Sequence, residues 1–150
     1  MSALTLAPWL SVRFVLGGFM EISAIVNNAA DEHRVAVRTD GASQALAIPP
    51  KSSGKGSAVN GGEFLMLALA TCYCNDLYRE AVRLGMTIDS VEVEASASFA
   101  GIGLAATNIR YRAVVESSAP AAAIAELLRQ TDAVAEVHNT IRAGTPVELK

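Results

Sequence analysis

The sequence contains few cysteines, few aromatic residues and no cluster of Lys and Arg. Cys72 and Cys74 are the only cysteines among 150 residues, too few and too close together for the disulfide framework of a small secreted protein. Because 12 basic residues stand against 15 acidic ones, the net charge is −3, and the counterion release that drives general nucleic-acid binding is missing. We therefore expect a protein of the reducing cytoplasm that binds no nucleic acid.

The sequence also lacks an apolar run long enough to cross a membrane. Pro8 and Arg13 interrupt the apolar stretch at residues 4–20, which has neither the basic start nor the cleavage site of a signal peptide. The run FLMLALATCYC at residues 64–74 is shorter than the roughly 20 residues that span a bilayer. It predicts a buried helix, and we expect no membrane association.

The period of the apolar residues changes from two to 3.6 and back along the chain. Alternation and turn residues predict strands over residues 20–27, 33–39, 42–49, 90–99, 108–116 and 140–149. Helices are predicted over residues 63–84, 121–130 and 133–139. The fold class is therefore α+β, with antiparallel sheets around a long buried central helix. We expect one domain over residues 20–150, with 50–62 as a connection and 1–19 as an N-terminal extension or extra strand.

The central helix and its start carry a recognisable motif: residues 60–72 are NGGEFLMLALATC, in which Glu63 precedes Cys72 by nine residues, and RLGM follows at the end of the helix. This segment resembles the OsmC/Ohr family of osmotically inducible and organic hydroperoxide resistance proteins. The likeness extends from about Met20 to the C-terminus. The resemblance implies an OsmC-like fold, an intertwined homodimer, and an active site shared between subunits with Cys72 and Glu63 as catalytic residues.

The sequence departs from the family pattern at several positions. The family's peroxidases carry a second cysteine before the last strand, and the matching segment DAVAEVHNT has Ala133 in its place. Gly61 replaces the proline of the family's helix start. The family's catalytic arginine has no assigned counterpart, and the open alternatives are Lys51, Lys55, Arg34 and Arg38.

A thiol is a nucleophile only as its thiolate, so Cys72 needs a nearby cation or hydrogen-bond donor. It lies more than two turns into the predicted helix, where the helix dipole contributes little. The alternative is a small buried core residue. Cys74 lies about 200° further around the helix, so we predict that it packs in the core and forms neither a disulfide with Cys72 nor a zinc site.

Glu63 and Cys72 lie half a turn out of phase and about 13.5 Å apart along the helix axis. They cannot meet within one continuous helix, but if two copies of the helix pack antiparallel around a two-fold axis, Glu63 of one chain can approach Cys72 of the other. The alternative role of Glu63 is a first-turn carboxylate that interacts with the helix dipole.

We predict no catalytic role for the other ionisable and aromatic residues. The two histidines, His33 and His138, are expected on the surface. A solvated helix face is expected for Asp76, Arg79, Glu80 and Arg83. Core or interface packing is expected for Trp9, Tyr73 and Tyr78.

These observations favour a thiol protein that reduces organic hydroperoxides through a sulfenic acid at Cys72, with an external thiol as reductant. The alternative is a dimer of the same fold without peroxidase activity that binds a small apolar ligand at the subunit interface. A third possibility is a purely structural dimer. No cofactor and no metal ion is expected.

Overall fold

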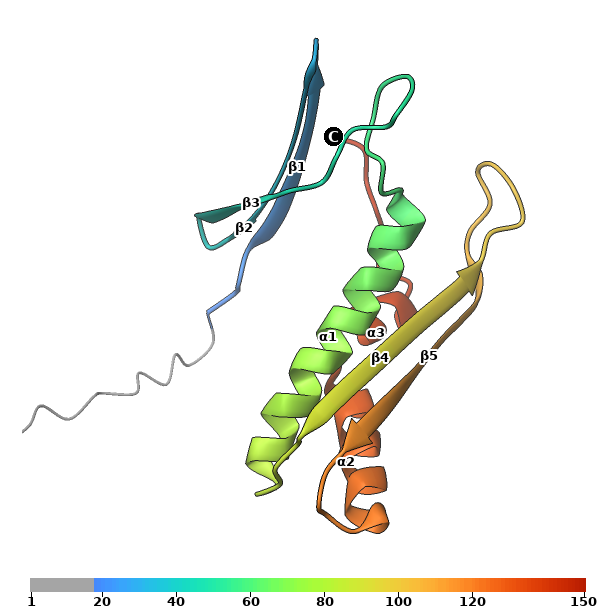
Figure 1. Ribbon diagram of the computed structural model, residues 1–150. Helices are drawn as coiled ribbons and strands as arrows, with labels where there is room; N and C mark the ends of the chain where they lie inside the picture. Colours follow the sequence, from blue (N-terminus) through green and yellow to red (C-terminus); the bar gives the residue numbers. More distant parts are fainter. Residues whose placement is uncertain (1–17) are drawn as a thin grey trace, which may run out of the picture. The chain divides into compact units, whose positions relative to one another are not determined.

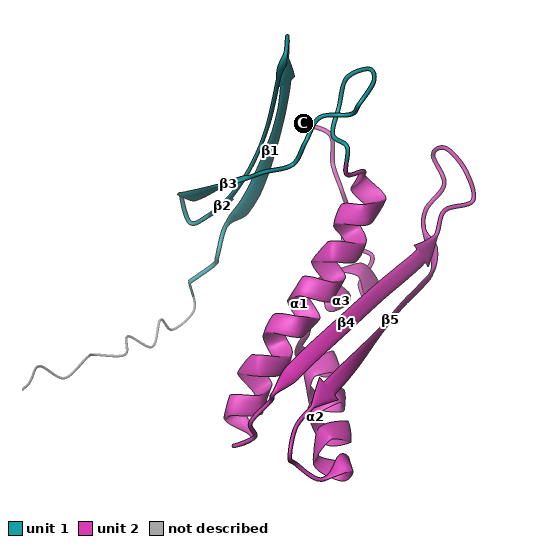
Figure 2. Ribbon diagram, in the orientation of Figure 1, with its two compact units in different colours: residues 1–58 teal, residues 59–150 magenta. Residues whose placement is uncertain are grey.

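Residues 18–150 are described by a computed structural model of the chain, and they divide into two compact units (Figures 1 and 2). Unit 1 is Met1–Ala58 and unit 2 is Val59–Lys150. The division falls within residues 50–62, the predicted connection. Trp9 and nearly all of the expected extension over 1–19 lie outside the described residues. Among residues 18–150, no helix combines the length and apolarity needed to span a bilayer.

Unit 1 contains a three-stranded antiparallel sheet in the order β1-β2-β3. Its strands are β1 (Ile22–Ala29), β2 (Glu32–Thr39) and β3 (Ala42–Leu46). Asp40 and Gly41 connect β2 to β3 with φ values of 48° and 85°. Positive φ at both central residues is the geometry of a type I′ hairpin turn, which explains the Asp-Gly pair and confirms the predicted hairpin.

Unit 2 begins with the long helix α1 (Gly61–Arg83), which confirms the helix predicted over residues 63–84. Asn60 caps its start: its side chain accepts from the Glu63 N–H at 3.0 Å, and the Glu63 carboxylate accepts from the Asn60 N–H at 2.8 Å. This reciprocal capping box satisfies two backbone donors that have no partner within the helix. Gly85, at a φ of 67°, turns the chain out of the helix at the other end.

The second hairpin and two shorter helices pack against α1 (Figure 1). These elements are β4 (Ser90–Ser98), β5 (Thr107–Glu116), α2 (Ala121–Val134) and α3 (Glu136–Arg142). Burial alternates strictly along β4, as expected for a sheet with one covered face. The core of unit 2 is formed by Tyr73, Leu77, Ala81, Leu127 and Ala135. The observed fold is therefore α+β, as predicted.

The C-terminal segment differs from the prediction. No strand forms over residues 140–149, because the last helix is shifted toward the C-terminus and includes Thr140. The Thr140 hydroxyl donates to the Glu136 carbonyl at 2.7 Å, and the Ala143 N–H donates to the Asn139 carbonyl at 2.9 Å. Local bonds of this kind complete the helical turn that alternation in the sequence had assigned to a strand.

Candidate functional site

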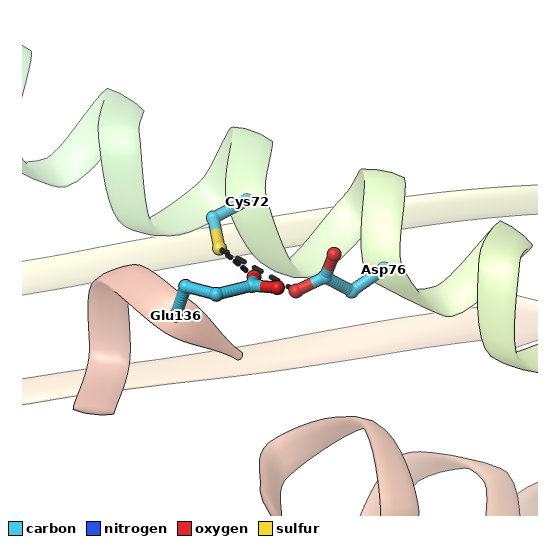
Figure 3. Close-up of side chains that lie close together, drawn as sticks. All are labelled: Cys72, Asp76 and Glu136. Atoms are coloured by element: carbon cyan, nitrogen blue, oxygen red, sulfur yellow. Dashed lines mark hydrogen bonds between the residues drawn. The ribbon is translucent and has the colours of Figure 1, made fainter. Parts of the chain in front are cut away.

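The thiol of Cys72 lies against two carboxylates at the junction of α1 and α3 (Figure 3). Its Sγ is 3.5 Å from Asp76 Oδ2 and 3.8 Å from Glu136 Oε2. Asp76 follows Cys72 by four residues, the spacing that puts two side chains on one face of a helix. Glu136 is the first residue of α3. We call these three residues the thiol cluster.

Arg79 joins the two carboxylates of the thiol cluster. Its Nη1 lies 2.8 Å from Asp76 Oδ1 and 3.4 Å from Glu136 Oε1. The cation paired with both carboxylates is thus a residue that the sequence analysis had assigned to a solvated face. The i,i+4 spacing of Cys72 and Asp76 and the i,i+3 spacing of Asp76 and Arg79 were the signals for this arrangement.

The expectation of a solvated face is wrong for Asp76 and Glu80 of α1. Asp76 is 5% exposed and Glu80 is 6% exposed, because α2 and α3 cover this side of α1. Each carboxylate is paired with an arginine that keeps about half its side chain in solvent: Asp76 with Arg79, and Glu80 with Arg83 at 2.6 Å. Paired in this way, the carboxylates can remain charged within the helix junction.

The surroundings of Cys72 favour the neutral thiol. Burial raises the pKa of the Cys72 thiol, and the negative charges of Asp76 and Glu136 raise it further, against the opposing effect of the Val137 backbone N–H. Burial and the neighbouring Glu136 also raise the pKa of Asp76, with Arg79 acting in the other direction. This is the reverse of the environment that stabilises a free thiolate.

The other predicted site residues lie away from the thiol cluster or in unit 1. Cys74 is half-buried and, like Cys72, a free cysteine. The Glu63 carboxylate is engaged in the capping box at the start of α1; its approach to Cys72 of a second subunit stays a prediction. Four basic residues were alternatives for the family's catalytic arginine, and all of them belong to unit 1: Arg34, Arg38, Lys51 and Lys55.

The residue that opposes Cys72 from the segment 132–140 is Glu136. Ala133, the position matched to the family's second cysteine, lies in the last turn of α2. Because the Glu136 carboxylate is the group that reaches the sulfur, this segment brings a negative charge to Cys72 and no second thiol.

The thiol cluster has the composition of a metal site but is already neutralised in part. Its three ligand atoms lie within 4.8 Å of one another, and a thiolate with two carboxylates is a set that Zn²⁺ accepts. However, Arg79 contacts one oxygen of each carboxylate and opposes the approach of a second cation. We assign no metal ion to the cluster.

His138 is buried, contrary to the prediction that it lies on the surface. Its ring packs against the rings of Tyr73 and Tyr111, with centroid separations of 5.6 and 4.4 Å. Tyr73 is a core residue, as predicted, and its hydroxyl donates to the Leu128 carbonyl at 2.7 Å.

Comparisons with known proteins agree with this architecture. Residues 54–150 match a family model described as OsmC-like protein. No curated protein sequence matches the chain. The fold is similar to that of an OsmC-like protein from Mycoplasma pneumoniae, with 21% identity, 83% of this chain and 88% of that chain covered, and a TM-score of 0.58.

Two further solved structures are similar in fold. An organic hydroperoxide resistance protein from Legionella pneumophila is 19% identical over 80% of this chain and 89% of its own, with a TM-score of 0.50. An OsmC-like protein of unknown function from Vibrio cholerae is 15% identical over 80% of this chain and 92% of its own, also with a TM-score of 0.50. At these identities the likeness establishes a shared fold.

Proposed function

The chain belongs to the OsmC family, and from this premise we propose that it reduces hydroperoxides at Cys72 with an external thiol as reductant. One solved structure of similar fold is named an organic hydroperoxide resistance protein. The observation that carries the proposal is the Cys72 thiol, which donates to the Asp76 carboxylate at 3.5 Å. A carboxylate in contact with a thiol can accept its proton as the sulfur reacts.

In the proposed reaction the proton of Cys72 passes to Asp76 while Sγ attacks one oxygen of the peroxide. The O–O bond breaks, sulfur gives up two electrons, and Cys72 becomes a sulfenic acid. The departing oxygen takes the proton back from Asp76 and leaves as an alcohol. Burial and Glu136 raise the pKa of Asp76. A carboxylate with a raised pKa accepts the thiol proton more readily and can then donate it to the departing oxygen.

Regeneration uses thiols from solution. One thiol attacks the sulfenic sulfur, which releases water and forms a mixed disulfide, and a second thiol then frees Cys72 and leaves as the oxidised reductant. This step needs an external thiol because Glu136, rather than a cysteine, faces Cys72, and because Cys74 is directed about 200° away around α1.

The test is peroxide consumption in the presence of a small thiol, measured for the wild type, Cys72→Ser and Cys74→Ser. We expect turnover to be lost in Cys72→Ser and retained in Cys74→Ser. The wild-type rate should rise with pH as the Asp76 carboxyl ionises and becomes able to accept the thiol proton, at a pH above its ordinary range because burial and Glu136 raise its pKa. Equal turnover by the wild type and Cys72→Ser would rule out this function.

A second function is supported by an open groove between α1 and β4, in which apolar side chains lie beside the ion pairs of Arg112 with Glu92 and Glu94. The groove has a volume of about 500 Å³, and one of its lining residues, Leu67, is 57% exposed. It is lined by Met66, Leu67, Ala70, Glu92, Val93, Glu94, Ala95 and Arg112. Under this alternative the family fold binds a small apolar ligand and has no peroxidase turnover.

The two functions are separated by binding of an apolar dye such as anilinonaphthalene sulfonate. The alternative predicts saturable dye binding and thermal stabilisation that survive Cys72→Ser and are lost in Leu67→Glu. Dye binding that is unaffected by Leu67→Glu counts against the groove.

A further inference from the structure

The buried imidazole of His138 has no hydrogen-bond partner among the described residues. The residue is 3% exposed, and both Nδ1 and Nε2 are buried without a donor or acceptor in reach. Burial and the neighbouring Arg142 lower its pKa, so the ring is neutral near pH 7. A neutral imidazole offers one N–H donor and one acceptor nitrogen, and both are left unpaired here.

Buried polar atoms in folded proteins are nearly always hydrogen-bonded, because leaving one unsatisfied forfeits the bonds it made to water. The ring of His138 is held in place by Tyr73 and Tyr111, whose hydroxyls donate to Leu128 and Asp132 instead. Residues 18–150 therefore leave both nitrogens of His138 open to a partner from solution.

A cavity of about 120 Å³ gives such a partner room. Its wall is mostly apolar, with His138 as the buried residue whose nitrogens are free. The lining residues are Leu69, Ile109, Tyr111, His138, Ile141 and Arg142. Cys72, Asp76 and Glu136 do not line it, so the cavity is separate from the thiol cluster.

The charges around the cavity are already paired. Arg142 Nη2 lies 2.6 Å from Asp132 Oδ1, and Arg142 Nη1 donates to the Asp132 carbonyl at 3.3 Å. The Tyr111 hydroxyl donates to the same Asp132 carboxylate. Because the guanidinium and the hydroxyl are both engaged, the cavity favours a neutral ligand over an anion.

We propose that this cavity binds a small neutral alcohol, whose hydroxyl pairs with His138 and whose alkyl chain contacts Leu69, Ile109 and Ile141. A hydroxyl both donates and accepts, so it satisfies either nitrogen in either tautomer. An apolar cavity of about 150 Å³ accommodates benzene, which limits the alkyl chain to a few carbons. The site goes beyond hydroperoxide reduction and does not depend on it.

The test is a titration of ¹⁵N-labelled protein with 1-butanol, followed by the imidazole nitrogen resonances. The chain has two histidines, and the ring nitrogens of His33 are also buried without a partner. Because His33 does not line the cavity, it is an internal reference for an unpaired imidazole outside the proposed site. We expect a saturable shift of a His138 nitrogen and no matching shift of His33. 1-Chlorobutane, which fills similar space without a donor, should bind about tenfold more weakly.

Two variants keep the proposal falsifiable. His138→Phe preserves an aromatic ring between the tyrosines and should raise the half-saturating concentration of 1-butanol about tenfold, as read from the Ile141 methyl resonances. Ile141→Phe fills the cavity and should abolish the His138 shift while the imidazole stays in place. The proposal is overturned if the His138 shift grows linearly without saturation, if His33 shifts equally, or if Ile141→Phe leaves binding intact.

Discussion

Replacing Asp76 with asparagine should change two reactions of Cys72 in opposite directions. Asparagine keeps the shape of the side chain but removes the charge that lies 3.5 Å from the sulfur. The thiolate then forms more readily, so alkylation by iodoacetamide becomes faster. The amide can neither take up nor return a proton, so peroxide reduction becomes slower.

The size of each change follows from the geometry of the thiol cluster. Two negative charges about 4 Å apart repel by about 1 kcal/mol in water and about 4 kcal/mol at an effective dielectric constant of 20. The lower figure applies here, because Arg79 lies 2.8 Å from Asp76 and the Glu136 side chain is 68% exposed. A gain of about 1 kcal/mol raises the thiolate population about fivefold, whereas loss of acid and base assistance costs about 10²–10⁴ in rate.

Both rates are measured in a Cys74→Ser background, so that Cys72 is the thiol whose reaction is measured. Alkylation is monitored by intact mass, and peroxide reduction is monitored by the consumption of peroxide. Glu126→Gln is a matched control for the loss of one carboxylate, because Glu126 pairs with Arg129 on α2, and it should change neither rate. The reasoning is refuted if Asp76→Asn moves both rates in the same direction while the variant unfolds at the wild-type temperature.

Four further outcomes are expected. Stoichiometric peroxide should give no intramolecular disulfide in the wild type, because Glu136 rather than a cysteine reaches the Cys72 sulfur; a loss of two hydrogens by intact mass would contradict this. Asn60→Ala should lower the free energy of unfolding in urea by about 1 kcal/mol through loss of the capping box. Burial lowers the pKa of His138, so stability should fall as pH drops below its ordinary value of 6.5, and His138→Phe should flatten this slope. Sedimentation at low micromolar concentration should show a dimer whose interface includes α1; a folded monomer as the main species would contradict this.

Most elements of the fold were predictable because their signals are local. Alternation over residues 90–99, the Asp40-Gly41 pair and the uninterrupted run that Gly85 ends each fix an element from its own residues. The prediction of a strand over residues 140–149 was wrong because it too rested on a local pattern alone. Apolar alternation there is weak, and the bonds that hold Thr140 in α3 depend on where that helix begins, which the local pattern did not define.

The candidate site was predictable only in part, because burial is a tertiary property. The thiol was identified from its place in the family motif. Its acidic partners were missed: Asp76 carries the i,i+3 pairing of a surface helix, and only the packing of α2 and α3 buries it. Glu136 is 64 residues from Cys72 in the sequence, and it reaches the thiol only because α3 packs against α1.

The charge of the thiol cluster decides which route to reaction the protein can use. Arg79 is one positive charge between the carboxylates of Asp76 and Glu136, so the cluster already carries an excess of negative charge before Cys72 ionises. A free thiolate would place a second uncompensated charge in the same junction, and repulsion and burial both oppose it. Moving the thiol proton to Asp76 during the attack adds no charge to the cluster. The arrangement therefore favours proton transfer within the cluster over a standing thiolate.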